Sequence, residues 1–190
     1  MTSNPSNNRR AIILVPILVL IVVGAFMFVG YALAVLFRIP IVLGLSLPTR
    51  LAGVALLAIA LALWVWLFQY RSPVDTLSST YLTFSKLVRK EELKENLGRR
   101  ERLVVQGPYK LVRHPMYLAV LISLVGWGLL LDLSFLLLAA VVALPWFNFV
   151  VMPFEERELL ALFGSDYEEY MKRVRRILPI PRSLIDRDKR

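Results

Sequence analysis

Cysteine is absent from this chain of 190 residues, and histidine occurs once, as His114. Without cysteine, disulfide bonds, thiolate nucleophiles, iron–sulfur clusters and cysteine-bound zinc are excluded. With a single histidine we also expect no histidine-rich metal site. Charge is missing from several long runs, and 57% of all residues are hydrophobic, against roughly 45–50% in an average soluble domain. The apolar excess, with a mean hydropathy of +0.62, predicts an integral membrane protein.

Four apolar runs are long enough to be considered as membrane spans, and they are Ala11–Phe37, Leu51–Phe68, Met116–Leu131 and Ser134–Met152. The first follows a basic pair, as a secretion signal does, but its 27 uncharged residues exceed the roughly 7–15 of a signal core. We therefore interpret it as a retained span. The last two runs are separated at Asp132, where we expect a tight turn. The sequence predicts an all-α integral membrane protein with about four transmembrane helices arranged as two hairpins.

The basic residues predict how this chain is oriented. Only Arg38 and Arg50, of 23 lysines and arginines, lie between the first two spans, and the other 21 fall on the opposite face of the membrane. By the positive-inside rule, both termini and the segment 71–115 are cytoplasmic. The net charge of +9 then reflects topology and attraction to anionic lipid headgroups, so we expect no nucleic-acid partner.

Three parts are expected along the chain: an N-terminal transmembrane hairpin (1–70), a core with a cytoplasmic loop, the second hairpin and a C-terminal helix (71–182), and a polar tail (183–190). Within the core, residues 75–98 have the pattern of an amphipathic helix lying on the membrane surface. A further helix, Glu155–Arg173, is expected to start after Pro153 and to break near Gly164. The helix before it should kink at Pro145, and Asn148 either satisfies the freed backbone groups or lines a substrate cavity.

One histidine and two glutamates stand at the two ends of the second hairpin. His114 precedes the third span, and Glu155 and Glu156 follow the fourth, so the hairpin should return them to one membrane face. Carboxylates accept hydrogen bonds from hydroxyl and amine groups and favour a cationic ligand, and the rings of Tyr109 and Tyr117 can attract a cation. We therefore predict a small cationic cofactor site at the cytoplasmic surface. The simpler alternative is that the histidine and acids only cap helices and that the basic residues 172–176 meet lipid phosphates.

Two sequence blocks add specificity to this interpretation. The first is Gly107-Pro108-Tyr109-x-x-x-Arg113-His114-Pro115-x-Tyr117, and the second is Glu155-Glu156-x-x-Leu159-x-x-x-Phe163-Gly164-x-x-Tyr167-x-x-Tyr170. Their order and separation closely resemble the isoprenylcysteine carboxyl methyltransferase and phospholipid methyltransferase families, over roughly residues 103–179. The resemblance implies a membrane-embedded methyltransferase that uses S-adenosyl-L-methionine, with the cofactor in a cytoplasmic pocket and a lipophilic acceptor entering from the bilayer.

The resemblance also implies which residues contact the cofactor. These are Leu103, Val104, Tyr109, His114, Pro115, Met116, Tyr117 and Glu155. We add Arg113 and Glu156 to this set because their charged side chains can hydrogen-bond the carboxylate, amine or ribose hydroxyls of the cofactor. The start of the third helix at Pro115 would offer free N–H groups to the cofactor carboxylate.

Four positions depart from the family pattern. Glu101 stands where many relatives have histidine, Ala119 where a glycine is frequent, and Arg175 where proline is common. Val151 occupies the position of an arginine that is implied in binding the acceptor carboxylate, so an isoprenylcysteine-like carboxylate would lack that cation here. A phospholipid amine would instead need a proton acceptor, for which Glu101, Glu156 and water are the candidates. No catalytic base is marked by the sequence.

Two other functions remain compatible with the sequence. A membrane reductase that uses NADPH is one, because sterol reductases resemble the same fold, and a non-enzymatic scaffold or transporter subunit is the other. The methyl acceptor and the oligomeric state are not encoded in any recognisable motif.

Overall fold

The computed structural model describes residues 5–70 and 103–178, and within them all regular structure is helical. The long elements are α1 (Pro5–Leu36), α2 (Leu47–Tyr70), α4 (Pro115–Leu131) and α5 (Ser134–Trp146). The short ones are the 3-10 helix η1 (Gly107–Lys110), the π-helical turn η2 (Phe147–Val151), α6 (Met152–Phe163) and α7 (Ser165–Arg173). The predicted surface helix at 75–98, the predicted tail at 183–190 and Glu101 lie outside the described residues.

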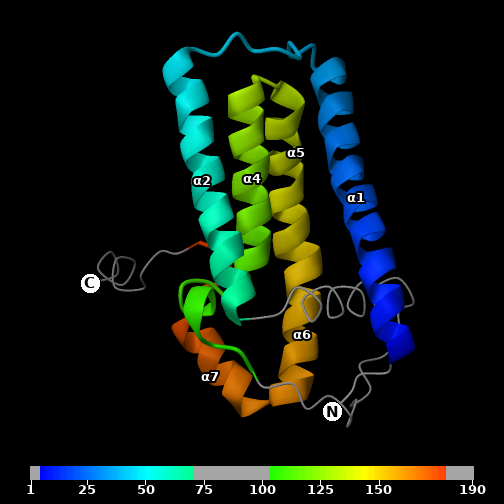
Figure 1. Cartoon of the computed structure of the whole chain (residues 1–190), viewed down its shortest axis with the longest axis vertical. Helices are drawn as coiled ribbons and strands as arrows, with labels where there is room; N and C mark the ends of the chain where they lie inside the picture. Colours follow the sequence, from blue (N-terminus) through cyan, green and yellow to red (C-terminus); the bar gives the residue numbers. More distant parts are fainter. Residues whose placement is uncertain (1–4, 71–102, 179–190) are drawn as a thin grey trace.

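The four long helices stand side by side in the order α2, α4, α5, α1 (Figure 1). α4 and α5 form the predicted second hairpin in the middle, α2 packs against α4, and α1 packs against α5. The predicted N-terminal hairpin is not confirmed, because α1 and α2 lie on opposite sides of the central pair. Their connection crosses the end of the α4–α5 hairpin, so each N-terminal helix is a flank of the bundle.

Two helices in the described residues are long and apolar enough to cross a membrane. They are α2, with 24 residues, and the continuous helix Ser134–Phe163 formed by α5, η2 and α6, with 30 residues. The apolar part of α1, Leu20–Leu36, and α4 are shorter. At a rise of 1.5 Å per residue, the 17 residues of α4 span about 25 Å. The outer surfaces carry exposed side chains such as Phe28, Leu61 and Phe149, as expected for helices that face lipid.

Glycines allow the flanking helices to lie close to the central pair. A Cβ atom added to Gly53 of α2 would lie 2.7 Å from the backbone nitrogen of Leu130 and 2.8 Å from the carbonyl oxygen of Gly126 in α4. A Cβ atom on Gly30 of α1 would meet the backbone of α5 just as closely. Of the five alanines in 52–62, only Ala60 is buried, and it shares the contact face with Gly53 and Leu67. Small residues therefore bring these helices together, as is common in membranes.

Asp132 closes the end of the bundle at the α4–α5 turn, which confirms the turn predicted there. Its backbone adopts the left-handed conformation (φ 63°). Its buried carboxylate accepts hydrogen bonds from the N–H groups of Gly44 (3.1 Å) and Leu45 (3.0 Å) and from the Arg50 guanidinium (2.8 Å). Burial raises the pKa of Asp132, but the Leu45 amide and Arg50 outweigh it, so the net pKa is lowered. This contact fixes the α1–α2 connection over the central hairpin.

The helix that follows α5 is irregular where proline was expected to kink it. After Pro145 it widens into the π-helical turn η2, in which the Met152 N–H donates to the carbonyl of Phe147, five residues back. The next residue, Pro153, has no N–H to give. The carbonyl oxygen of Asn148 is therefore left without a donor from its own helix. Pro153 lies in the first turn of α6, as predicted, although α5, η2 and α6 run on as one continuous helix.

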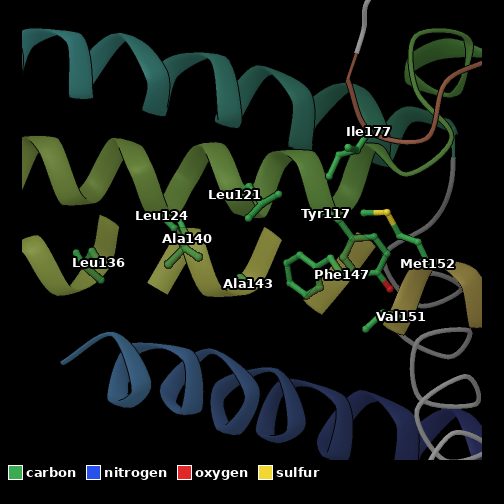
Figure 2. Close-up of a cluster of buried hydrophobic side chains, with 10 residues drawn as sticks. All are labelled: Tyr117, Leu121, Leu124, Leu136, Ala140, Ala143, Phe147, Val151, Met152 and Ile177. Atoms are coloured by element: carbon green, nitrogen blue, oxygen red, sulfur yellow. The ribbon is translucent and has the colours of Figure 1, made fainter. Parts of the chain in front are cut away.

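A buried apolar cluster runs along α4 and α5 and continues through η2 to the start of α6 (Figure 2). Tyr117 of α4 packs on Phe147 of η2, with ring centroids 4.8 Å apart. Ile177, which follows α7, inserts its side chain into the same cluster. At Gly164 the backbone adopts φ +50°, which side chains disfavour, and the predicted break between α6 and α7 occurs there. This break lets the C-terminal segment return to the core.

Replacing Gly53 with alanine should destabilise the bundle, since its methyl group would clash with backbone atoms of α4 that cannot move independently. We expect a loss of about 1–3 kcal/mol, typical of overpacking, measured as a lower midpoint of unfolding in detergent. Gly24→Ala is the matched control, because nothing lies within 4 Å of a Cβ atom there. Equal midpoints for the two variants would contradict the close α2–α4 contact.

Candidate functional site

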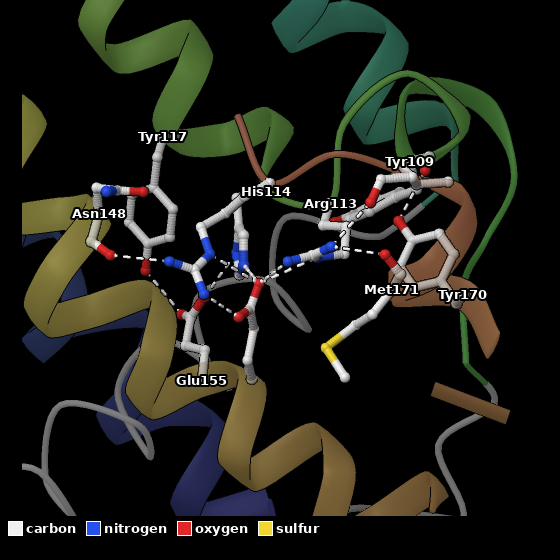
Figure 3. A network of polar contacts seen from close by, with 11 residues as sticks. Tyr109, Arg113, His114, Tyr117, Asn148, Glu155, Tyr170 and Met171 are labelled. Atoms are coloured by element: carbon white, nitrogen blue, oxygen red, sulfur yellow. Dashed lines mark hydrogen bonds and ion pairs between the residues drawn. The ribbon is translucent and has the colours of Figure 1, made fainter. Parts of the chain in front are cut away.

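The second hairpin brings His114 to the two glutamates at the end of the bundle opposite Asp132 (Figures 1 and 3). His114 immediately precedes α4, while Glu155 and Glu156 lie in α6, beyond the π-helical turn. Nδ1 of His114 lies 3.3 Å from Oε2 of Glu155, and its Nε2 lies 3.3 Å from Oε1 of Glu156. The imidazole thus bridges both carboxylates.

Glu156 is buried and its two oxygens are surrounded by cations. Arg113 donates to Oε1 from Nε (3.0 Å) and from one terminal nitrogen (2.6 Å). Arg176 donates from Nε to Oε1 (3.1 Å) and from a terminal nitrogen to Oε2 (2.5 Å). With the His114 contact, Glu156 interacts with three basic side chains. A buried charge requires such compensation, so Glu156 is committed to contacts within the protein.

Glu155 has a different environment. Its side chain is 19% exposed, compared with 7% for Glu156. It accepts a hydrogen bond from the Tyr117 hydroxyl (2.7 Å) and contacts the imidazole of His114. In the part of the chain that the structure describes, no arginine or lysine pairs with Glu155. Of the two acids, Glu155 is therefore the one with charge available to a cationic ligand.

His114 is the N-cap residue of α4, but the polar contacts of its side chain are with the two glutamates and not with the helix. Its side chain makes no capping hydrogen bond to α4, and it is buried against the acids and 5.8 Å from the Tyr117 ring. Burial lowers the pKa of His114, but the hydrogen bonds and charges of Glu155 and Glu156 outweigh this and raise its pKa above the ordinary value of 6.5. The imidazolium form can donate to both carboxylates at once, which explains the direction of the shift.

The C-terminal segment holds the loop that carries His114. The backbone N–H groups of Arg113 and His114 donate to the carbonyl oxygens of Arg175 (2.7 Å) and Arg176 (3.0 Å). The Arg113 guanidinium also donates to the carbonyl oxygens of Met171 and Val174 at the end of α7. The Tyr170 hydroxyl donates to the carbonyl of Tyr109 (2.7 Å). The loop is thus attached to α7 and its continuation by five hydrogen bonds.

The remaining candidates lie along the same loop and the start of α4. Leu103 and Val104 are partly buried in the segment that leads into η1, which contains Tyr109. Pro115 is buried at the first turn of α4, and Met116 beside it is partly buried. All ten predicted residues therefore belong to one loop, one helix start and one turn of α6.

Two residues of the site were not predicted from the sequence. Arg176 was assigned to the lipid surface with the neighbouring basic residues, but its guanidinium contacts Glu156 and the Asn148 carbonyl. Tyr167 was named only as a member of the second sequence block, with no role in the site. It is buried in α7, and its hydroxyl has no hydrogen-bond partner within the described residues. A run of basic residues gives no signal that separates Arg176 from the others.

The comparisons with known proteins agree with one another. A family model described as phospholipid methyltransferase matches residues 48–166. Methanethiol S-methyltransferase 1 of Bradyrhizobium diazoefficiens is 39% identical over 77 residues, which are 40% of this chain and 26% of that protein. The probable protein-S-isoprenylcysteine O-methyltransferase of Oryza sativa subsp. indica is 37% identical over 78 residues, 41% of each chain. Protein-S-isoprenylcysteine O-methyltransferase B of Arabidopsis thaliana is 37% identical over 73 residues, 38% of this chain and 37% of that protein.

These matches span well under half the length of the relatives. No solved structure matches the chain with statistical significance.

Stability should depend on the protonation of His114. Because its folded pKa lies above 6.5, the imidazolium contributes stability that is fully present below about pH 6.5 and is lost as the pH rises through the folded value. Wild type and His114→Gln should therefore differ most in midpoint of unfolding at low pH and converge at high pH. A constant difference from pH 5.5 to 9 would show that the charge of His114 contributes nothing.

Glu156→Gln should destabilise the protein more than Glu155→Gln. The first change leaves Arg113 and Arg176 without their shared anion, which we expect to cost about 2–3 kcal/mol, less than for a fully buried pair because Arg176 is one-third exposed. Glu155→Gln leaves no arginine unpaired. Unfolding midpoints measured side by side in the same detergent test the difference, and the reverse order would contradict it.

Proposed function

This chain belongs to the phospholipid methyltransferase family, and we propose that it transfers a methyl group from S-adenosylmethionine to a lipophilic acceptor in a membrane. The observation that carries the proposal is the contact of Glu155 with His114 and Tyr117, which lie about 40 residues earlier in the sequence; all three fall within the matched range. The S- and O-methyltransferases among its relatives favour methyl transfer over reduction by NADPH or a scaffold role.

The chemistry of the residues fits this cofactor. S-adenosylmethionine would supply a methyl group already activated by a positively charged sulfur. Glu155 retains a negative charge that attracts a cation, and the Tyr117 ring lies beside His114 with an electron-rich face. We assign the contacts with the cofactor to Glu155, His114, Tyr117, Tyr109, Pro115, Met116, Leu103 and Val104. Arg113 and Glu156, whose charges neutralise one another, hold these residues in position.

Catalysis would then rest on alignment and exclusion of water. Displacement at an activated methyl group needs a nucleophile held in line, and little more from the protein. Tyr117 connects the ionic residues to the apolar cluster, because its hydroxyl binds Glu155 while its ring packs on Phe147. The site therefore borders both a polar surface and the interior of the bundle, where a lipophilic acceptor can be held.

The environment of Val151 bears on the acceptor. The resemblance places at this position an arginine that binds an acceptor carboxylate, but Val151 is buried in the apolar cluster with Phe147 and Met152. A carboxylate acceptor would have no cation there. We therefore propose an acceptor whose nucleophile is an uncharged thiol or amine, in preference to an isoprenylcysteine-like carboxylate. We also propose, from the distribution of basic residues, that the site faces the cytoplasm.

Purified protein should bind S-adenosylmethionine saturably, and Glu155→Gln should bind it about tenfold more weakly, as expected for loss of a charged contact. Isothermal titration in detergent measures both. Glu168→Gln, an exposed acid of α7, is the matched control and should bind like wild type. Absence of binding by folded wild type would reject the proposed function.

The acceptor class can be tested with labelled S-adenosylmethionine and matched lipophilic thiols, amines and carboxylates in nanodiscs. We expect label in a thiol or amine and none in a prenylcysteine analogue. Transfer only to the carboxylate would contradict the argument from Val151. Oxidation of NADPH without methyl transfer would support a reductase instead.

A further inference from the structure

Arg176 connects the His114 loop to two neighbouring parts of the helix that carries the glutamates. Its backbone carbonyl accepts the N–H of His114 (3.0 Å). Its guanidinium holds both oxygens of Glu156 through Nε and one terminal nitrogen. The other terminal nitrogen donates to the carbonyl oxygen of Asn148 (3.2 Å) in the π-helical turn. Arg176, which lies beyond the end of α7, thus contacts the His114 loop, α6 and the irregular turn between α5 and α6.

The contact with Asn148 is specific because that carbonyl has no donor in its own helix. In η2 the Met152 N–H reaches back to Phe147, and Pro153 has no N–H. A carbonyl partly removed from water and without a partner is unfavourable, and Arg176 donates a hydrogen bond to it. The planar guanidinium can serve this oxygen and the Glu156 carboxylate together because its donors point in fixed directions. The irregular turn and the arginine therefore complement each other.

We propose that Arg176 is the positioning residue of the site: it fixes the π-helical turn and Glu156 against the loop, and so sets the place of His114. This inference rests on the proposed function for its consequence in methyl transfer. It concerns a residue outside the matched range of the family, which ends at residue 166. Arg176 acts through Glu156 and His114. We assign it no contact with the cofactor or the acceptor.

The neighbouring basic residues do not share this role. Arg173 is on the exposed face of α7 and pairs with Glu169 one turn earlier, with a side chain 74% exposed against 33% for Arg176. Ile177, directly after Arg176, is inserted in the apolar cluster, so the backbone around Arg176 is fixed independently of its guanidinium. Shortening the Arg176 side chain should therefore remove its contacts without releasing the segment. Arg173→Ala is the matched control.

The position of His114 can be measured without any ligand, because it is the only histidine in the chain. Protein labelled with ¹⁵N-histidine and purified through a histidine-free tag gives ring signals from this residue alone. The charged groups that surround it are Arg113, Glu155, Glu156 and Arg176, with the hydroxyl of Tyr117 bound to Glu155. A titration of the ring signals from pH 5 to 9 gives the pKa of His114 in each variant.

The direction in which the pKa of His114 changes distinguishes a positioning role of Arg176 from the effect of its positive charge alone. If Arg176 only contributes a positive charge, its removal raises the pKa of His114, because a repelling cation is gone. If it holds Glu156 in contact with the imidazole, its removal breaks that contact and lowers the pKa toward 6.5. We expect the lower value in Arg176→Ala, a partial return in Arg176→Lys, and the wild-type value in Arg173→Ala. Unfolding midpoints confirm that the variants are folded at the temperature used.

Binding of S-adenosylmethionine completes the test. Arg176→Ala should bind about tenfold to a hundredfold more weakly, the range expected when a ligand-holding group is displaced, and Arg173→Ala should bind normally. An unchanged or raised pKa of His114 in Arg176→Ala overturns the inference, whatever the cofactor result. Wild-type protein that fails to bind S-adenosylmethionine rejects the proposed function and leaves the histidine titration to decide the role of Arg176. Full recovery of the pKa and of binding in Arg176→Lys would show that charge alone suffices, which also overturns it.

Discussion

A carboxylate removed from water has to be surrounded by cations and N–H donors. Those around Glu156 come from two segments, one more than 40 residues before it in the sequence and one 20 residues after it. Arg113 arrives from the loop before α4 and Arg176 from the segment after α7. If either is displaced, a charge is left buried without compensation. The positions of α4, α6 and the C-terminal segment relative to one another therefore depend on this one anion, and so does the place of His114.

The irregular stretch of helix between Pro145 and Pro153 also helps to hold Arg176 beside Glu156. A regular helix would satisfy the carbonyl of Asn148 internally and leave Arg176 only the carboxylate to bind. The π-helical turn also adds a residue to the helix between the apolar cluster and the glutamates, which changes the direction in which Glu155 and Glu156 project. Glu155 can then reach Tyr117 and His114 while Glu156 points toward the arginines. Two neighbouring acids thus acquire different environments and different roles.

Much of the fold could be predicted from the sequence because apolar runs, turn residues and helix breaks are local signals. The helices, the turn at Asp132, the break at Gly164 and the approach of His114 to the glutamates were predicted in this way. The order of the helices could not be, since it depends on which faces fit closely, as at Gly53 and Gly126. Arg176 could not be distinguished from Arg173 because both are basic residues near the end of α7, and only the folded chain turns one toward Glu156 and leaves the other mostly exposed.

The separation of α1 from α2 by the central pair has a consequence for biosynthesis. The ribosome delivers α1 and α2 first, yet each finds its main partner only in a helix that is made later. Helices that insert separately and associate afterwards are the general route for membrane proteins, and within the described residues the main contacts of α1 and α2 fit this order. The packing of α1 and α2 into the bundle therefore waits until the α4–α5 hairpin has been made and Asp132 can bind the loop that connects them.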